Sequence, residues 1–214
     1  MRHNLKSTLT RSLLALSLLA VYAPPAAAQM EGRVMVGVGV SSTFPSSSDL
    51  ESGLSIGYSI GTVPKEGWGL AWAFNWYGAD VKGEAVGTQG KFGRLSVRPI
   101  MIGVGYTHAA GRFTVSPNVV LGPALNTLRI DSAQRPSFAL EGDDFDRKGG
   151  TWSLAVRPAV TVNYALTSRF GLSGTAGYVF NKSTFDLGTP AGSLEKEFDS
   201  NAFNVRAGVI LSLF

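Results

Sequence analysis

The sequence predicts an all-β fold, an eight-stranded antiparallel up-and-down transmembrane β-barrel. Three observations support this prediction: apolar and small residues alternate with period two, short and long connections alternate along the chain, and the apolar set is rich in bulky aromatics. Only 16% of the 214 residues are charged, whereas about 25% is usual in soluble domains. Much of the surface is therefore expected to face a medium other than water.

An N-terminal secretory signal is expected over residues 1–28. Three basic residues and no acid precede an apolar run over 12–21, and small residues end the segment before Gln29, as in a cleaved signal peptide. The run is too short for a transmembrane helix, which needs about 20 residues. Residues 29–214 are expected to form the barrel. Cleavage lowers the formal net charge from +4 to +1 and leaves no basic stripe for nucleic acid.

Eight segments alternate between apolar and small or polar residues, which gives each predicted strand one apolar face. They cover residues 34–41, 54–61, 68–76, 93–106, 113–125, 152–164, 170–180 and 203–213. Short turns are expected at 63–67, 108–111 and 167–169, and long polar loops at 41–49, 78–91, 130–150 and 183–201. This sorting of connections is typical of a transmembrane meander with both termini on the short-turn side.

The bulky apolar residues are expected to face lipid, because the lumen of a small barrel suits small and polar side chains. Aromatics near the strand ends predict two interfacial belts. The belt residues are Trp68, Tyr106, Phe113, Tyr164 and Phe170 near the short turns, and Trp76, Trp152, Phe180 and Phe203 near the long loops. The alternative is a soluble ligand-binding barrel with an aromatic core.

Prolines interrupt the lipid-facing pattern at Pro117, Pro123 and Pro158. Each removes a backbone donor where no water replaces it, so we expect bulges at these positions. Arg98 precedes Pro99 and has the parity of the lipid-facing residues. Because a cation at mid-depth on lipid costs about 2–4 kcal/mol, we predict a bulge near Pro99 that turns Arg98 into the lumen.

Arginines are the principal candidates for a luminal site. Arg157 and Arg206 have luminal parity, and Arg98 joins them if the bulge forms. Buried cations need a charged partner or hydration, and Glu51, or Glu84 folded back from a loop, is a candidate partner. An ion-paired plug is the expected role of this group, with a narrow anion-preferring pore as the alternative.

We predict no catalytic residue, cofactor or metal. His108, the one histidine after the predicted signal, lies in an expected turn with no carboxylate nearby in the sequence, which disfavours histidine-based catalysis. The acidic segment 141–146 offers carboxylates of the kind that hold hard cations. Its spacing differs from that of an EF-hand, and a solvated loop is the preferred interpretation.

The segment 206–214 contains Gly208, alternating Leu211 and Leu213, and a final Phe214. It resembles the C-terminal assembly signal of outer-membrane barrels, which implies the barrel-assembly machinery as a partner during biogenesis. Over residues 30–214 the pattern is similar to the OmpA/OmpX-type small outer-membrane barrels. This resemblance implies a location in the cell outer membrane, with outer-membrane lipid and lipopolysaccharide as partners, and we expect a monomer.

An eight-stranded barrel has an interior just wide enough for side chains, so a general diffusion porin is not expected. Our first functional hypothesis is a non-enzymatic membrane protein, structural or surface-interacting through loops 130–150 and 183–200. The second is a narrow OmpW-like channel for small solutes. A lipid-modifying outer-membrane enzyme that does not use histidine is the remote third hypothesis.

Overall fold

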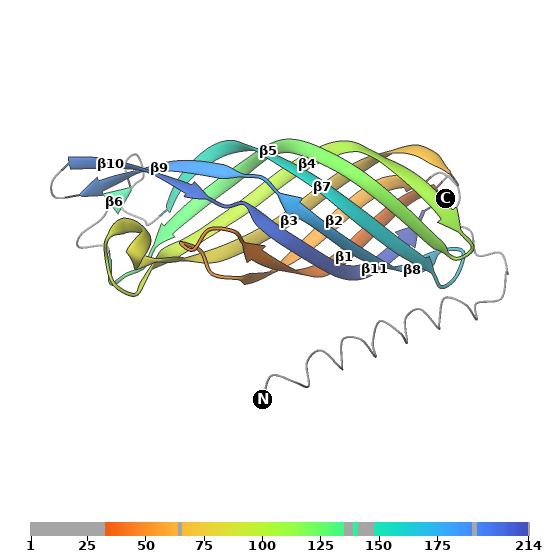
Figure 1. Ribbon diagram of the computed structural model, residues 1–214, viewed down its shortest axis with the longest axis horizontal. Helices are drawn as coiled ribbons and strands as arrows, with labels where there is room; N and C mark the ends of the chain where they lie inside the picture. The colour runs from red at the N-terminus through yellow and green to blue at the C-terminus, as the bar shows by residue number, and fades with distance from the viewer. Residues whose placement is uncertain (1–32, 64–65, 135–138, 141–147, 190–191, 214) are drawn as a thin grey trace, which may run out of the picture.

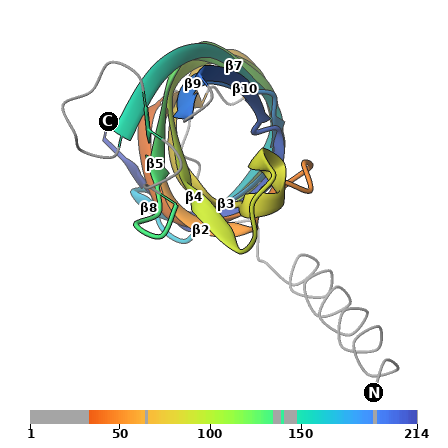
Figure 2. The same ribbon diagram turned by 90° about the vertical axis from the view of Figure 1, so that its left-hand side faces the viewer.

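The computed structural model describes residues 33–63, 66–134, 139–140, 148–189 and 192–213. Eight long strands close into an antiparallel barrel in the order β1-β11-β8-β7-β5-β4-β3-β2, shown from the side in Figure 1 and along its length in Figure 2. These strands are β1 (Arg33–Pro45), β2 (Gly53–Val63), β3 (Gly67–Lys82), β4 (Lys91–Ala110), β5 (Phe113–Ile130), β7 (Lys148–Ala165), β8 (Phe170–Val179) and β11 (Ala202–Ser212). The predicted eight-stranded barrel is confirmed.

The connections divide the barrel into two distinct ends. Short connections after β2, β4 and β7 lie at one end, here called the turn end, on the right in Figure 1. Long connections lie at the other, the loop end, and include the 3-10 helix η1 (Gly83–Val86). Among the described residues, no helix combines the length and apolarity needed to cross a membrane. The predicted signal peptide over 1–28 lies outside the described residues.

A second sheet extends beyond the barrel at the loop end. Its strands are β10 (Gly192–Asp199), β9 (Lys182–Thr189) and β6 (Ala139–Leu140), in that order, and Figure 1 shows the sheet extending beyond the left-hand end of the barrel. The sequence predicts a polar loop over 183–201, whereas the chain forms a hairpin there. The reason is alternation within β9, where Phe185 and Leu187 are buried and the residues between them are exposed.

Register is constant through the prolines, so the bulges predicted at Pro117, Pro123 and Pro158 are not found. The β5–β7 ladder pairs residues with one offset from Phe113–Tyr164 to Arg129–Lys148. A residue offers its N–H to only one of its two neighbouring strands. A proline therefore interrupts pairing on one side, while the other side keeps the strand in register.

The bulge predicted near Pro99 is likewise absent. Pairs Phe74–Ile100 and Tyr77–Val97 flank that position with the same offset in the β3–β4 ladder. Arg98 consequently keeps the parity of the outward-facing residues and is half-buried on the outer wall. The prediction that Arg98 turns into the lumen is wrong.

The apolar side chains of β4 lie on its outer face near the turn end and on its inner face near the loop end. This change explains why the sequence alternation breaks around Pro99. Toward the turn end, β4 directs Ile100 and Ile102 outward, about half exposed. Toward the loop end, its inward positions Leu95 and Val97 are buried and its outward Arg94 is exposed. The loop-end part thus has the apolar interior of a water-soluble barrel, although the parity of the strand never changes.

Candidate functional site

Side chains fill the lumen in layers, and the lumen is the candidate functional site. An apolar cluster extends from the loop end to the middle of the barrel, and both the barrel strands and the outer sheet contribute to it. Six of its larger members are at most 2% exposed: Phe92, Leu95, Met101, Leu128, Leu187 and Phe198. This layer closes the loop end of the lumen with apolar contacts.

A network of buried, hydrogen-bonded amides and hydroxyls lies beside the apolar cluster, since Asn126 stands between the cluster residues Ala124 and Leu128 on β5. The Asn181 side-chain amide donates to Asn126 Oδ1 at 2.8 Å and to Ser200 Oγ at 2.7 Å. The Asn126 amide donates to Ser153 Oγ at 2.7 Å, and Ser153 in turn donates to Asn181 Oδ1. A closed network of this kind fixes the relative positions of β5, β7 and the start of β9.

Two arginines form the next layer toward the turn end. Arg157 from β7 and Arg206 from β11 are 4% and 5% exposed, as their luminal parity predicts. Arg206 donates through Nη2 to Ser59 Oγ at 3.1 Å and to Thr175 Oγ1 at 3.2 Å. Arg157 Nε is buried without a hydrogen-bond partner among the described residues. The two cations also repel each other.

The predicted acidic partners do not reach these arginines. Glu51 lies exposed in the connection between β1 and β2, where its backbone N–H donates to the Asp80 carbonyl at 2.9 Å. Glu84 is exposed in η1. Within the described part of the chain, no salt bridge includes Arg157 or Arg206. Hydroxyl groups, and not carboxylates, are therefore the protein ligands of this layer.

A cavity of about 90 Å³ adjoins the arginine layer. Both arginines line it, together with hydroxyl and amide groups such as Thr161 and Asn163, and with Gly37. A volume of this size accommodates about three water molecules, at roughly 30 Å³ each. Met35 of β1 and Ile210 of β11 also line this cavity, and with Ala165 of β7 they form a small apolar cluster on one side of the lumen near the turn end.

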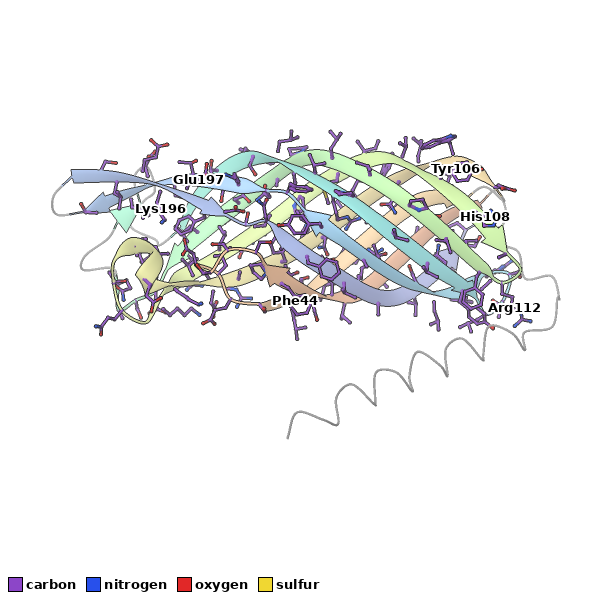
Figure 3. All side chains as sticks on the ribbon, in the orientation of Figure 1. Phe44, Tyr106, His108, Arg112, Lys196 and Glu197 are labelled. Carbon is purple, nitrogen blue, oxygen red and sulfur yellow. The ribbon has the colours of Figure 1, made fainter. Side chains whose placement is uncertain are left out.

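The residues predicted as aromatic belts lie on the outer wall near both ends. Trp68 is 73% exposed and stacks edge-on against Tyr106, with ring centroids 5.7 Å apart; Figure 3 shows Tyr106 pointing away from the barrel near the turn end. Phe113 and Tyr164 form another turn-end pair. The remaining predicted belt residues are 45–64% exposed: Trp76, Trp152, Phe170, Phe180 and Phe203.

His108 has a partner that sequence spacing did not suggest. Its Nδ1 lies 3.3 Å from Glu66 Oε1, brought next to it by the pairing of β3 with β4. Both side chains are more than 60% exposed, and Figure 3 labels His108 at the turn end. The described residues hold no group of three His, Cys, Asp or Glu side chains able to bind a metal, and the acidic segment 141–146 lies outside them.

Ionic contacts attach the outer sheet to the barrel and to itself. Lys182 Nζ donates to Glu197 Oε1 at 2.9 Å, and this hydrogen bond raises the pKa of Lys182. Lys196 approaches Asp49 Oδ2 of the β1–β2 connection at 3.9 Å. Lys196 and Glu197 are labelled at the loop end in Figure 3.

The C-terminal strand ends as alternation predicts. Leu213 is 46% exposed on the outer wall and Leu211 is half-buried with the same parity. Gly208 lies opposite Gly39 where β11 pairs with β1. Phe214, the last residue of the predicted assembly signal, lies outside the described residues.

A closed barrel of eight antiparallel strands, an apolar outer wall and aromatics at both ends define an integral β-barrel of the outer-membrane class. Residues 13–210 match the family described as outer membrane protein beta-barrel domain, and the chain belongs to that family. Its location is the outer membrane. No curated protein sequence matches the chain.

Solved structures of similar fold are bacterial outer-membrane proteins. OprG from Pseudomonas aeruginosa has a TM-score of 0.63 and 15% identity, over 86% of this chain and 96% of that one. Neisserial surface protein A has a TM-score of 0.52 and 17% identity, over 84% and 97%. Ail of Yersinia pestis has a TM-score of 0.51 and 11% identity, over 86% and 99%. These identities support similarity of fold alone.

Proposed function

We propose that this protein is a non-enzymatic outer-membrane barrel with a closed lumen, which acts as a structural and surface-interacting element through its loop end. The observation that carries the proposal is the packing of the lumen. Apolar side chains at most 6% exposed fill the lumen from the loop end to its middle, and a small apolar cluster lies on one side of the lumen near the turn end. Eight strands leave little more room than side chains need.

The arginine layer adds an electrostatic barrier to solutes. Two buried guanidinium groups line a cavity of about 90 Å³ in the lumen. A hydrated ion passing this layer would lose part of its hydration shell in a narrow interior. The positive charge of the arginines would in addition repel cations. The amide network beside the apolar cluster is held by short hydrogen bonds, which order the side chains there.

The outer sheet supplies the interacting surface in this proposal. β9 and β10 extend beyond the end of the barrel (Figure 1) and pair along their whole length, from Lys182–Asp199 to Thr189–Gly192. The buried ring pair Phe185–Phe198 anchors the hairpin to the apolar cluster. The face of β10 carries exposed side chains from Gly192 to Glu195, which are available to a partner outside the cell.

A second candidate function is a narrow channel for small apolar solutes. It is favoured by the apolar character of the loop-end lumen, whose lining resembles a protein core and would not repel a hydrocarbon-like molecule. Such a solute would have to displace the packed side chains at Phe198 and Leu187, because both are nearly inaccessible.

Planar-bilayer recording of the refolded full-length protein separates these functions. We expect no steady single-channel steps in potassium chloride, and no faster uptake of a small aromatic solute into liposomes that contain the barrel. Steady steps that disappear in Arg157→Met or Arg206→Met would overturn the closed-lumen proposal. Faster uptake of the aromatic solute, abolished by Leu187→Trp, would instead establish the apolar channel.

The surface role has a separate test. Replacing residues 184–197 with a short Gly-Ser turn removes the outer hairpin and leaves the eight barrel strands in place. We expect reduced adherence of bacteria expressing this variant compared with bacteria expressing equal amounts of the complete protein. Equal adherence at equal surface abundance would contradict an interacting role for the hairpin.

A further inference from the structure

Two arginines face each other on the outside of the barrel at the loop end. Arg94 of β4 lies directly opposite Arg129 of β5 in the ladder, and both side chains are exposed. Directly paired residues on neighbouring strands have Cβ atoms about 4.5–5.5 Å apart, and like charges at that separation destabilise the sheet. The pair therefore favours an anion bound between the two side chains.

No described carboxylate forms a salt bridge with this pair. Asp80 of β3 lies opposite Arg94 in the ladder, but its Oδ2 accepts a 2.7 Å hydrogen bond from Lys91 Nζ, and its Oδ1 has no hydrogen-bond partner among the described residues. No described salt bridge reaches Arg94, Arg98 or Arg129. Arg94, Arg98 and Arg129, which lie on the outer wall, are together called the basic patch.

Gly78 allows Arg94 to lie flat against the wall. A Cβ atom built at Gly78 would fall 2.9 Å from Arg94 Nε and 3.2 Å from its Nη2. The Arg94 guanidinium thus occupies the space that a side chain at Gly78 would fill. The basic patch therefore covers part of β3 as well as β4 and β5. The register places Lys148 of β7 beside Arg129 on the other side.

The position of the basic patch along the barrel axis indicates which layer of the membrane it contacts. Arg98 lies opposite Leu125, and Leu125 lies opposite Trp152 of the loop-end aromatic residues. Arg94 is four positions farther toward the loop end, about 13 Å along the strand at 3.3 Å per residue. A strand tilt of about 40° converts this to roughly 10 Å along the barrel axis. Interfacial aromatics lie at headgroup level, so the patch extends through the headgroup layer of the outer leaflet.

We propose that the basic patch binds the phosphate groups of lipopolysaccharide in the outer leaflet. Guanidinium groups match phosphate through paired N–H donors, and they retain their charge in partly desolvated sites. A phosphate between Arg94 and Arg129 would relieve their repulsion, while acyl chains of the same molecule lie along the apolar wall near Ile100 and Leu121, each about half exposed. This inference rests on the outer-membrane location and is independent of whether the lumen is closed.

The test is a titration of the full-length protein in detergent micelles with purified lipid A. We expect wild type to bind bisphosphorylated lipid A, and Arg94→Gln/Arg129→Gln to bind it at least about tenfold more weakly, since charge-assisted hydrogen bonds are lost. Arg112→Gln/Arg169→Gln is the matched control. It removes two charges at the turn end, and we expect its affinity to be that of wild type. Heat-dependent gel mobility establishes that each variant is folded.

A second comparison needs no variant. Lipid A treated with phosphatase has the same acyl chains, and we expect wild type to bind it as weakly as the double variant binds the phosphorylated form. Equal affinity for both lipids, or equal loss in the turn-end control, would overturn the proposal. Inorganic phosphate alone should not compete at millimolar concentration; if it competes fully, the ligand is a free anion and not a lipid.

Discussion

Gly39 and Gly208 face each other across the seam between β1 and β11, the two strands that close the barrel. Their backbones approach so closely that a Cβ atom at Gly208 would fall 2.2 Å from the Val38 carbonyl oxygen and 2.7 Å from the Cα of Gly39. Such contacts involve backbone atoms, which cannot move aside without separating the strands. The closing seam therefore requires glycine at this level.

Gly208→Ala is expected to impair barrel closure, because the added methyl group forces β1 and β11 apart where they share backbone hydrogen bonds. The measurement is the fraction of refolded protein that migrates differently with and without boiling on a denaturing gel. We expect a clear fall in that fraction. Gly174→Ala is the control, since the nearest atom to its Cβ lies 4.0 Å away. Equal folding of the two variants would contradict the seam argument.

Asn181→Leu should destabilise the barrel through the buried amide layer. Asn181 is 2% exposed, and its side chain bonds to Asn126 and Ser200, so the substitution leaves buried polar groups without partners. Each such group costs about 1–3 kcal/mol. Guanidinium unfolding in micelles should give a lower midpoint than wild type.

Lys182→Ala, at the next position, supplies the control for the Asn181 variant. The side chain of this exposed lysine forms a salt bridge with Glu197 at the protein surface, and such contacts contribute less than about 1 kcal/mol. A loss of stability in Lys182→Ala as large as that in Asn181→Leu would show that the hairpin, and not the amide layer, determines the effect.

Phe198→Ala should release the outer hairpin while the barrel stays folded. Phe198 is 1% exposed and contacts Phe185 with ring centroids 6.0 Å apart. Truncating a buried phenylalanine costs about 3–5 kcal/mol, which exceeds what the surface ion pairs of β9 and β10 provide. Limited proteolysis of the micellar protein should cut the variant between residues 182 and 199. Resistance equal to that of wild type would contradict this anchoring role.

The strands were predictable because each one alternates against the same two environments over its membrane-spanning length. The loop-end continuation was not, since beyond Pro99 the inward positions become apolar and the outward ones basic. Leu95 and Val97 are buried inside while Arg94 is exposed outside, so the sequence pattern imitates a shift in register. A β-bulge and a change in the environment of the two faces produce the same break in the alternation of a single strand. Only the register with the neighbouring strands distinguishes them.

Partners of the luminal arginines were equally inaccessible to sequence reasoning. Parity identified Arg157 and Arg206 as luminal, but it carries no information on which strands face each other across the lumen. The actual partners of Arg206 are Ser59 of β2 and Thr175 of β8, residue types too common to single out. The hairpin of β9 and β10 was missed because charged residues near Glu195 and Lys196 obscured the alternation of Phe185 and Leu187.

Arg157→Met should leave the folded barrel as stable as wild type or more stable. Arg157 is buried, has no hydrogen bond to described residues through Nε and lies near the charge of Arg206. Methionine keeps much of its volume without the charge, and replacing buried charges by apolar groups of similar size is neutral or stabilising by about 1–4 kcal/mol. Arg206→Met should gain less stability, because it also removes the donor to Ser59 and Thr175.

Unfolding midpoints of the two variants and wild type in the same micelles provide the measurement. If Arg157→Met unfolds earlier than Arg206→Met, Arg157 is held by interactions stronger than its described surroundings provide, and the cavity beside it must stabilise its charge.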